Sequence, residues 1–441
     1  MPESCRYGPA LSELQRVSRR NRAKGPDPFL LFEYTGAGKH ISRRDRNADT
    51  ATGAIPDARF SVLGTSVRSR TPRSLPRADV PSAMRMKDKG MGKQYEQIYR
   101  FDNLYQAWRL AKRSKSRDAE VQRFSLDLGN RLWSLHDRLK ARSYVPGGYY
   151  HFTITEPKKR EIYALHFEDR VVQHSICDNL LRPWMEARLI YDCAACRIGK
   201  GTHFAMDRLS GFLREFYRRH GTSGYVLKCD IRKYFDNIDH QILKDRLSKF
   251  PDKEVLRLLF SFVDAYNGAE GKGIPLGNQS SQWFALYYLD PVDRLVKEKL
   301  RVRWYTRYMD DFLLLHPSKE YLKHCLAEIK ALAAELKLEL NGKTQIFPLK
   351  QGVDYLGFHF YLTDTGRVVR LLRTSGKRRF KRKMKALRKR YEEGGVSLEE
   401  INMSLASYRG HLSHGNTWRM RGRTFSHFVL RPPRSYSLRP P

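Results

Sequence analysis

Short apolar runs in the second half of the chain end at aspartate residues. Residues 225–229 (YVLKC) predict a β-strand, and Asp230 follows it directly. The segment RYMDDFLLLH (307–316) sets Asp310 and Asp311 between two further apolar runs, which predicts a β-hairpin with both carboxylates at its tip. Because the strands of one sheet can bring their ends close together, we expect the three carboxylates to share one site.

Polar and apolar spacing predicts further elements before this hairpin. The segment 151–165 indicates two strands joined by a basic turn at Pro157–Arg160, and a helix that begins near Glu168 or Asp169 follows. Asp239 is placed as the N-cap of another helix, because it directly precedes a run with apolar residues at helical spacing.

The turn GKGIPLGNQSSQ (271–282) is rich in Gly and Pro and precedes a long apolar-periodic stretch. We expect one amphipathic helix that runs through Leu300, with Phe284, Tyr287 and Leu295 on its buried side.

The two ends of the chain differ from its middle. Residues 1–90 mix Arg, Ser, Gly, Pro and Asp without a period, so we expect a basic, weakly ordered extension, with Met84, Met86 or Met91 as alternative start sites. Near the other end, SGKRRFKRKMKALRKRYEEG predicts a helix that is apolar on one face and cationic around the rest. Residues 431–441 are expected to be a disordered tail.

Composition narrows the class of protein. The chain has 441 residues, 41% of them hydrophobic, and a formal net charge of +36, which favours a polyanionic partner such as nucleic acid over a small neutral ligand. A purely structural basic protein is the alternative at this point. No apolar run is long enough to span a membrane, no secretion signal opens the chain, and six cysteines form no regular framework, so we expect a cytoplasmic protein that does not contact a membrane.

Two chemical readings compete at the carboxylates. Asp310 and Asp311 could simply cap a turn, and Asp230 could cap a helix. Carboxylate oxygens also suit Mg²⁺, with Mn²⁺ as the alternative ion, and two such ions can activate a 3′-hydroxyl and hold a triphosphate. Cys193 and Cys196 form a single CxxC without a second pair, so no zinc is assigned.

The sequence RYMDDF resembles the YxDD box of reverse transcriptases, and KCDIRKYFDNIDH (228–240) resembles their DxxxxF motif. The resemblance covers roughly residues 91–425. It implies an α+β right-hand polymerase fold, with the extension 1–90, fingers at 91–220, a palm with an antiparallel sheet and helices at 221–365, and a helical thumb at 366–430.

Site residues follow from the resemblance. Asp230, Asp310 and Asp311 would be catalytic and would bind two Mg²⁺ ions, with Asp230 and Asp310 as the principal ligands. Phe235 would be the steric gate that favours dNTPs, and Lys343 is a candidate for protonating the pyrophosphate. The other residues expected to bind the dNTP are Lys158, Lys159, Arg160, Leu276, Gly277 and Gln282. Those expected at template or primer are Gly199, Gly201, Lys377, Arg378, Arg379, Lys381, Arg382 and Lys385. Taken alone, a KKR sequence is more often a solvated turn than a binding site, and Lys343 is more often interpreted as a surface lysine.

One turn differs from the usual motif of the family and indicates a subfamily. The turn IPLGNQSSQ has Leu276 where Gln is usual and Gln282 where Pro is usual, and this form resembles reverse transcriptases of diversity-generating retroelements within the bacterial group II intron-like clade. An error-prone, RNA-directed DNA polymerase is implied, with reduced fidelity notably opposite template adenine, acting on an RNA template, a DNA or RNA primer and dNTPs. The alternatives are a phage-defence reverse transcriptase with a structured noncoding RNA, and an RNA-binding maturase-like protein. A small basic accessory protein is a further expected partner.

Overall fold

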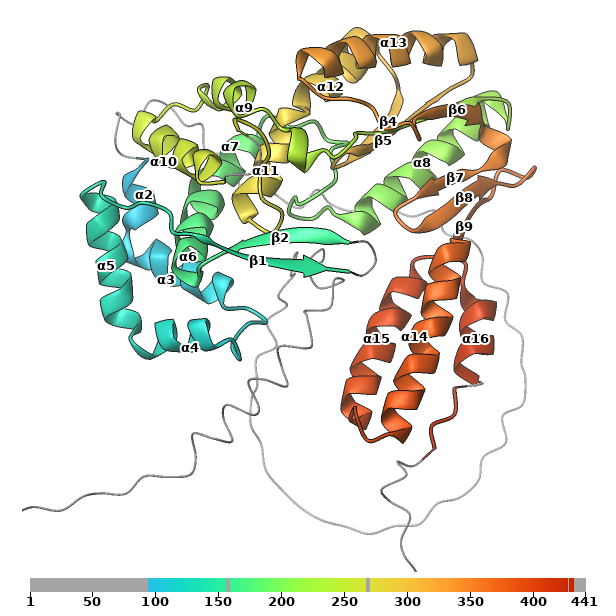
Figure 1. Ribbon diagram of the computed structural model, residues 1–441. Coiled ribbons are helices and arrows are strands. Elements are labelled where there is room, and N and C mark those ends of the chain that lie inside the picture. The colour runs from blue at the N-terminus through green and yellow to red at the C-terminus, as the bar shows by residue number, and fades with distance from the viewer. Residues whose placement is uncertain (1–93, 156–158, 267–269, 427, 432–441) are drawn as a thin grey trace, which may run out of the picture. The chain divides into compact units, whose positions relative to one another are not determined.

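The computed structural model describes residues 94–155, 159–266, 270–426 and 428–431, which belong to one compact unit of the chain (Figure 1). The expected extension 1–90, Lys158 and the tail after residue 431 lie outside these residues. None of the described helices is long and apolar enough to cross a membrane.

Helices with one apolar face form the N-terminal part of the described chain. Leu104 and Trp108 are buried on α3, and Asp118 caps α4 by accepting a hydrogen bond from the backbone N–H of Glu120 at 3.0 Å. The helices of this part are α2 (Glu96–Tyr99), α3 (Phe101–Ala111), α4 (Ala119–Leu126), α5 (Leu128–Lys140), α6 (Phe167–Ile176), η1 (Cys177–Leu181) and α7 (Arg182–Glu186).

The expected pair of strands is confirmed as β1 (Tyr149–Ile154) and β2 (Arg160–Leu165), which form an antiparallel two-stranded ribbon (Figure 1). The helix that follows, α6, begins at Phe167, one or two residues before the expected start. The second strand of the ribbon therefore begins at Arg160, one of the residues expected to bind the dNTP.

A four-stranded antiparallel sheet holds the three carboxylates. Its strands lie in the order β4 (Trp304–Tyr308), β5 (Asp311–His316), β3 (Tyr225–Asp230) and β6 (Gln345–Pro348). Both faces are covered, because Phe312 and Leu314 pack into one apolar core while Leu313 and Leu315 pack into another. This explains the continuous apolar run in β5, where a sheet with one solvated face would show alternation.

The first of these cores contains side chains of the N-terminal helices and of the helices that follow β3. Asp239 caps α9 as predicted, accepting a hydrogen bond from the backbone N–H of Ile242 at 3.0 Å. The helices that follow α7 up to β6 are α8 (Thr202–His220), η2 (Phe235–Asn237), α9 (His240–Leu247), α10 (Lys253–Asp264), α11 (Gln279–Tyr288), α12 (Asp290–Arg294), η3 (Leu295–Lys299) and α13 (Lys319–Glu335).

The expectation of one helix through Leu300 is wrong. The stretch is divided into α11, α12 and a π-helical turn, η3. Pro291 lies in the first turn of α12, where its missing N–H and its ring interrupt a continuing helix. Phe284, Tyr287 and Leu295 are nevertheless buried, as expected.

A second sheet and a helical bundle complete the described chain (Figure 1). The antiparallel strands β7 (Val353–Tyr355), β8 (Phe358–Leu362) and β9 (Val368–Leu372) follow a short 3-10 turn, η4 (Leu349–Gln351). Strand β9 lies after the expected palm boundary at residue 365. The bundle helices are α14 (Thr374–Glu392), α15 (Leu398–Ser413) and α16 (Trp418–Ser426).

The apolar stripe predicted for the cationic helix is confirmed on α14. Phe380, Met384 and Leu387 are buried, and Tyr391 is half-buried. These buried side chains belong to the second apolar core, which also contains Phe358 and Phe360 of β8.

Candidate polymerase active site

The three carboxylates meet where two strand ends pair. In the register of β3 and β5, Asp230 lies directly opposite Asp311. Asp310 occupies the two-residue turn between β4 and β5, in which Met309 has a left-handed φ of 54°. The predicted hairpin tip is therefore confirmed, and the turn places Asp310 beside the Asp230–Asp311 pair.

A buried ion pair holds the backbone of this turn in place. Arg307 and Asp293 are both 0% exposed, and their side chains meet in a bidentate contact, with Nε to Oδ1 at 2.8 Å and Nη2 to Oδ2 at 2.6 Å. Arg307 also donates from Nη1 to the carbonyl of Met309 at 3.0 Å, and Tyr305 donates to Asp293 Oδ1 at 2.6 Å. The guanidinium thus fixes the backbone of the turn that carries Asp310.

The pKa values of Asp310 and Asp311 are shifted mainly by burial and, to a lesser degree, by neighbouring charges. Burial raises the pKa of Asp310 to about 6, and the nearby Asp230 and Asp311 carboxylates add to the rise. Burial also raises the pKa of Asp311 to about 6, although Lys228 opposes the shift. Both shifts mean that ionised carboxylates here are unfavourable without a compensating cation.

Two side chains that were not predicted from the sequence are hydrogen-bond partners of the carboxylates. Asn341 donates from Nδ2 to Asp230 Oδ2 at 2.9 Å, and its backbone N–H donates to the Asp230 carbonyl at 2.7 Å. Lys228 donates to Asp311 Oδ2 at 3.3 Å. Residue 341 is far from the aspartates in sequence, but the alternation of β3 puts Lys228 and Asp230 on one face and could have identified the lysine.

The donor set fits a divalent cation in its chemistry. Asp311 Oδ1 is buried and has no hydrogen-bond partner, which is costly for a carboxylate oxygen unless a cation occupies the site. Within the described ranges, however, no three His, Cys, Asp or Glu side chains already converge as ligands of one ion. The single CxxC at Cys193 and Cys196 likewise belongs to no such group, and both thiols are free.

The expected dNTP-binding residues come from several elements around this site. Arg160 is close enough to Asp310 to lower its pKa, against the effect of burial, whereas Lys159 is exposed and Lys158 lies outside the described residues. The backbone carbonyl of Phe235 accepts a hydrogen bond from the N–H of Ile274 at 2.9 Å. This bond joins the 3-10 turn η2 to the loop that contains Leu276.

The loop after Ile274 approaches the ribbon. Gly277 has a φ of 116°, and a Cβ added there would lie 3.5 Å from Ile162 Cγ2 of β2. Leu276 and Gln282 are half-buried, and Gln282 lies on α11. Lys343 is exposed and lies in the loop that also carries Asn341. This loop follows Glu339, whose backbone carbonyl accepts a hydrogen bond from the N–H of Arg232.

The residues expected at template or primer fall into two separate sets. Gly199 and Gly201 have φ values of 71° and 114°, and nothing lies within 4 Å of a Cβ added at either, so open space borders both. Of the cations expected there on α14, Arg378, Lys381, Arg382 and Lys385 are exposed, while Lys377 and Arg379 are half-buried.

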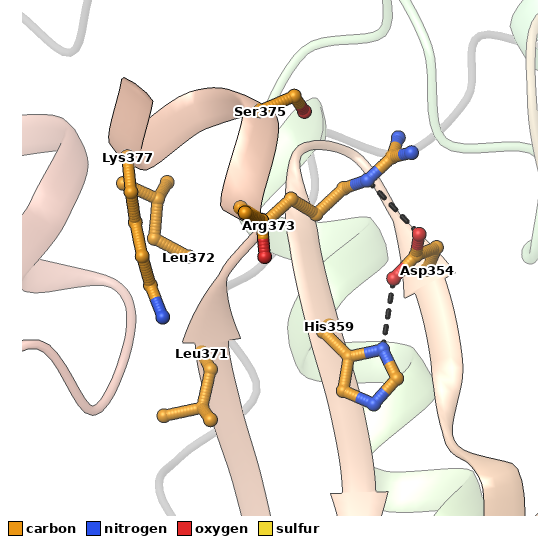
Figure 2. A pocket seen from close by; sticks show the side chains of 8 residues that line it. Asp354, His359, Leu371, Leu372, Arg373, Ser375 and Lys377 are labelled. Carbon is orange, nitrogen blue, oxygen red and sulfur yellow. Dashed lines mark hydrogen bonds and ion pairs between the residues drawn. The ribbon is translucent and has the colours of Figure 1, made fainter. Parts of the chain in front are cut away.

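A pocket of about 440 Å³ lies where β7, β8 and β9 meet the start of α14 (Figure 2). Asp354 binds two side chains there, accepting from Arg373 Nε at 3.0 Å and contacting His359 Nδ1 at 2.8 Å. Lys377 also lines the pocket. Arg373 lowers the pKa of Asp311 against the effect of burial, so this basic pocket borders the carboxylate site.

The antiparallel sheet with paired carboxylates and the helices of its two cores define a right-hand polymerase fold of mixed helix and antiparallel sheet. A family model described as reverse transcriptase (RNA-dependent DNA polymerase) matches residues 156–360. Residues 156–360 are therefore similar to the reverse transcriptase domain, the domain of RNA-directed DNA polymerases, which are nucleotidyltransferases.

Solved structures give a distant likeness. A telomerase from Candida albicans, in complex with a fragment of telomeric RNA, is 15% identical over 65% of this chain and 55% of that chain, with a TM-score of 0.40. An apo telomerase from Candida tropicalis is 13% identical over 51% of this chain and 49% of that chain, with a TM-score of 0.39. The chain thus spans about half the length of these two proteins. None of the curated proteins compared with it matches.

Proposed function

We propose that the protein is an RNA-directed DNA polymerase that extends a primer 3′-hydroxyl with dNTPs on an RNA template. The observation that carries this proposal is the β3–β5 register, which pairs Asp230 with Asp311 beside Asp310 within the reverse transcriptase domain. Two Mg²⁺ ions, or Mn²⁺, would be held chiefly by Asp230 and Asp310. When bound, the ions supply activation of the 3′-hydroxyl and neutralisation of the triphosphate.

The chain's own residues would orient the reactants. Arg160, with Lys158 and Lys159, would neutralise the triphosphate, because guanidinium and ammonium groups donate to phosphate oxygens. Phe235 would exclude a 2′-hydroxyl. Lys343 is exposed and would deliver a proton to the leaving pyrophosphate.

The nucleic acid would be bound by backbone charge. The exposed cations of α14, among them Arg378, Lys381 and Arg382, suit a duplex backbone, and the open space at Gly199 and Gly201 suits the template strand. The boundaries of fingers, palm and thumb stated above are part of this proposal.

We further propose that synthesis is error-prone, as in a diversity-generating retroelement. The support is the resemblance of the IPLGNQSSQ turn, in which Leu276 offers no hydrogen bond to an incoming base pair. A small basic accessory protein would be the partner in this role, whereas a structured noncoding RNA would be the partner of a phage-defence reverse transcriptase.

Primer extension on an RNA template tests the activity. Wild type should extend a primer in the presence of Mg²⁺ and dNTPs, and Asp310→Asn should reduce the rate by at least about a thousandfold, because the variant loses a ligand charge. Asp102→Asn, which changes an exposed carboxylate on α3, is the matched control and should extend normally. Product sequencing tests fidelity: errors concentrated at template adenines support diversification, and a uniform low error rate contradicts it. Extension by Asp310→Asn at the wild-type rate would refute the assignment.

A further inference from the structure

One lysine connects the two sheets beside the carboxylate site. Lys228 lies on β3 and donates to Asp311 Oδ2 of β5 at 3.3 Å. The same ammonium group donates to the backbone carbonyl of Asp354 on β7 at 2.7 Å. Lys228 therefore contacts both the hairpin that carries the carboxylates and the first strand of the second sheet.

The position of Lys228 on its strand is unusual for a lysine. Lys228 shares one face of β3 with Val226 and Asp230, because every second residue of a strand points to the same side. Val226 is fully buried in the second apolar core. The side chains of Lys228 and Asp311 are only 22% and 26% exposed. A charge in such surroundings is stable only with a partner, so the pair with Asp311 determines where the ammonium group lies.

The other contact of Lys228 leads into the pocket. Asp354 accepts Lys228 at its carbonyl, while its carboxylate holds Arg373 and His359 (Figure 2). A chain of polar contacts thus runs from Asp311 through Lys228 to the backbone carbonyl of Asp354, whose carboxylate contacts side chains that line the pocket. Any group that binds at Arg373 is connected to Asp311 through residues Asp354 and Lys228.

The contact also divides the roles of the carboxylates. Asp311 Oδ2 is engaged by an ammonium group, while Asp230 lies opposite Asp311 with its own donor, Asn341. A carboxylate with one oxygen held by a lysine is a weaker metal ligand than one that can turn both oxygens to the ion.

We propose that Lys228 is a positioning residue, which holds Asp311 Oδ2 away from the metal ions and fixes the carboxylate hairpin against β7. The inference rests on the proposed function, because it concerns the site of nucleotidyl transfer. It assigns Asp311 Oδ2 as an anchor of the hairpin, leaves only Oδ1 of that carboxylate for an ion, and keeps Asp230 and Asp310 as the principal metal ligands.

The first test is metal binding without turnover. Mn²⁺ titrations followed by electron paramagnetic resonance compare wild type with Lys228→Met, and circular dichroism confirms that the variant is folded. Removal of the ammonium group frees Asp311 and removes a repelling charge, so Mn²⁺ should bind at least about fivefold more tightly. Unchanged Mn²⁺ affinity in a folded variant would overturn the proposal, whether or not the wild type polymerises.

The second test is primer extension. Misplacement of the hairpin in Lys228→Met should slow extension about ten- to a hundredfold, so tighter metal binding and slower synthesis occur together. Lys228→Arg keeps the charge and a donor and should stay within about fivefold of wild type. If Lys228→Met does not fold, Lys228→Gln retains a donor to Asp354 without the charge and should give the same pair of effects.

The double variant Lys228→Met/Asp311→Asn tests the route of the effect. Because Lys228 acts through Asp311, the double variant should be no slower than the slower of the two single variants. Losses that multiply would contradict the proposal. Absence of extension by wild type on every primer supplied would instead count against the proposed function, and the Mn²⁺ titrations would still decide the role of Lys228.

Discussion

Replacement of Arg307 by methionine should strongly destabilise the fold. Arg307 and Asp293 are both fully buried, and burial alone would lower the pKa of Arg307, but the Asp293 carboxylate raises it well above its usual value. Arg307→Met leaves Asp293 buried with Tyr305 as its remaining side-chain partner. Removal of one member of a buried ion pair costs about 3–5 kcal/mol, so the free energy of unfolding should fall by that amount.

Urea unfolding followed by circular dichroism measures this loss. Arg303→Met is the matched control, because Arg303 is 57% exposed and pairs with Glu215 at the surface, and its loss should stay below about 1 kcal/mol. The double variant Arg307→Met/Asp293→Leu removes both buried charges and should recover most of the lost stability. A loss below about 1 kcal/mol for Arg307→Met would refute the reasoning, since it would mean that Asp293 tolerates isolation in the core.

Three further predictions concern other parts of the chain. Gly352→Ala places a Cβ 2.5 Å from His359 Nε2 at a φ of 77° and should cost about 2–4 kcal/mol in thermal unfolding, whereas Gly199→Ala, at a similar φ in open space, should cost about 1–2 kcal/mol. Equal losses would contradict the steric argument. Phe235→Ala should raise the kcat/KM for rNTPs relative to dNTPs at least about tenfold, and an unchanged ratio would remove Phe235 as the steric gate. Asp252→Ala removes the cap that accepts from two backbone N–H groups of α10 and should cost about 1–2 kcal/mol in urea unfolding. A loss within error would show that the cap is dispensable.

Local patterns predicted much of the site. The strand before Asp230, the hairpin tip at Asp310 and the cap at Asp239 each depend on a few adjacent residues, and all three are confirmed. The prediction of one helix through Leu300 was wrong because the apolar periodicity continues past Pro291, whereas a continuous backbone helix does not.

Long-range contacts could not be predicted in the same way. Asn341 reaches Asp230 only because the loop before β6 returns to the end of β3. The partner of Arg307 lies fourteen residues earlier, on α12, and its role depends on full burial of both groups, which no local pattern reports. Local sequence patterns therefore identified the carboxylates but not the side chains that hold them.

The two-residue turn at Met309 and Asp310 has a consequence for how the site can vary. Alternate side chains of β5 enter different cores, so a single inserted or deleted residue would exchange Phe312 and Leu313 between them. The identity of residue 309 can change, and its left-handed φ of 54° even favours glycine, but the length of the loop cannot. A library that randomises Met309 at constant length should yield folded proteins, whereas one that varies the number of residues between Tyr308 and Asp311 should yield almost none.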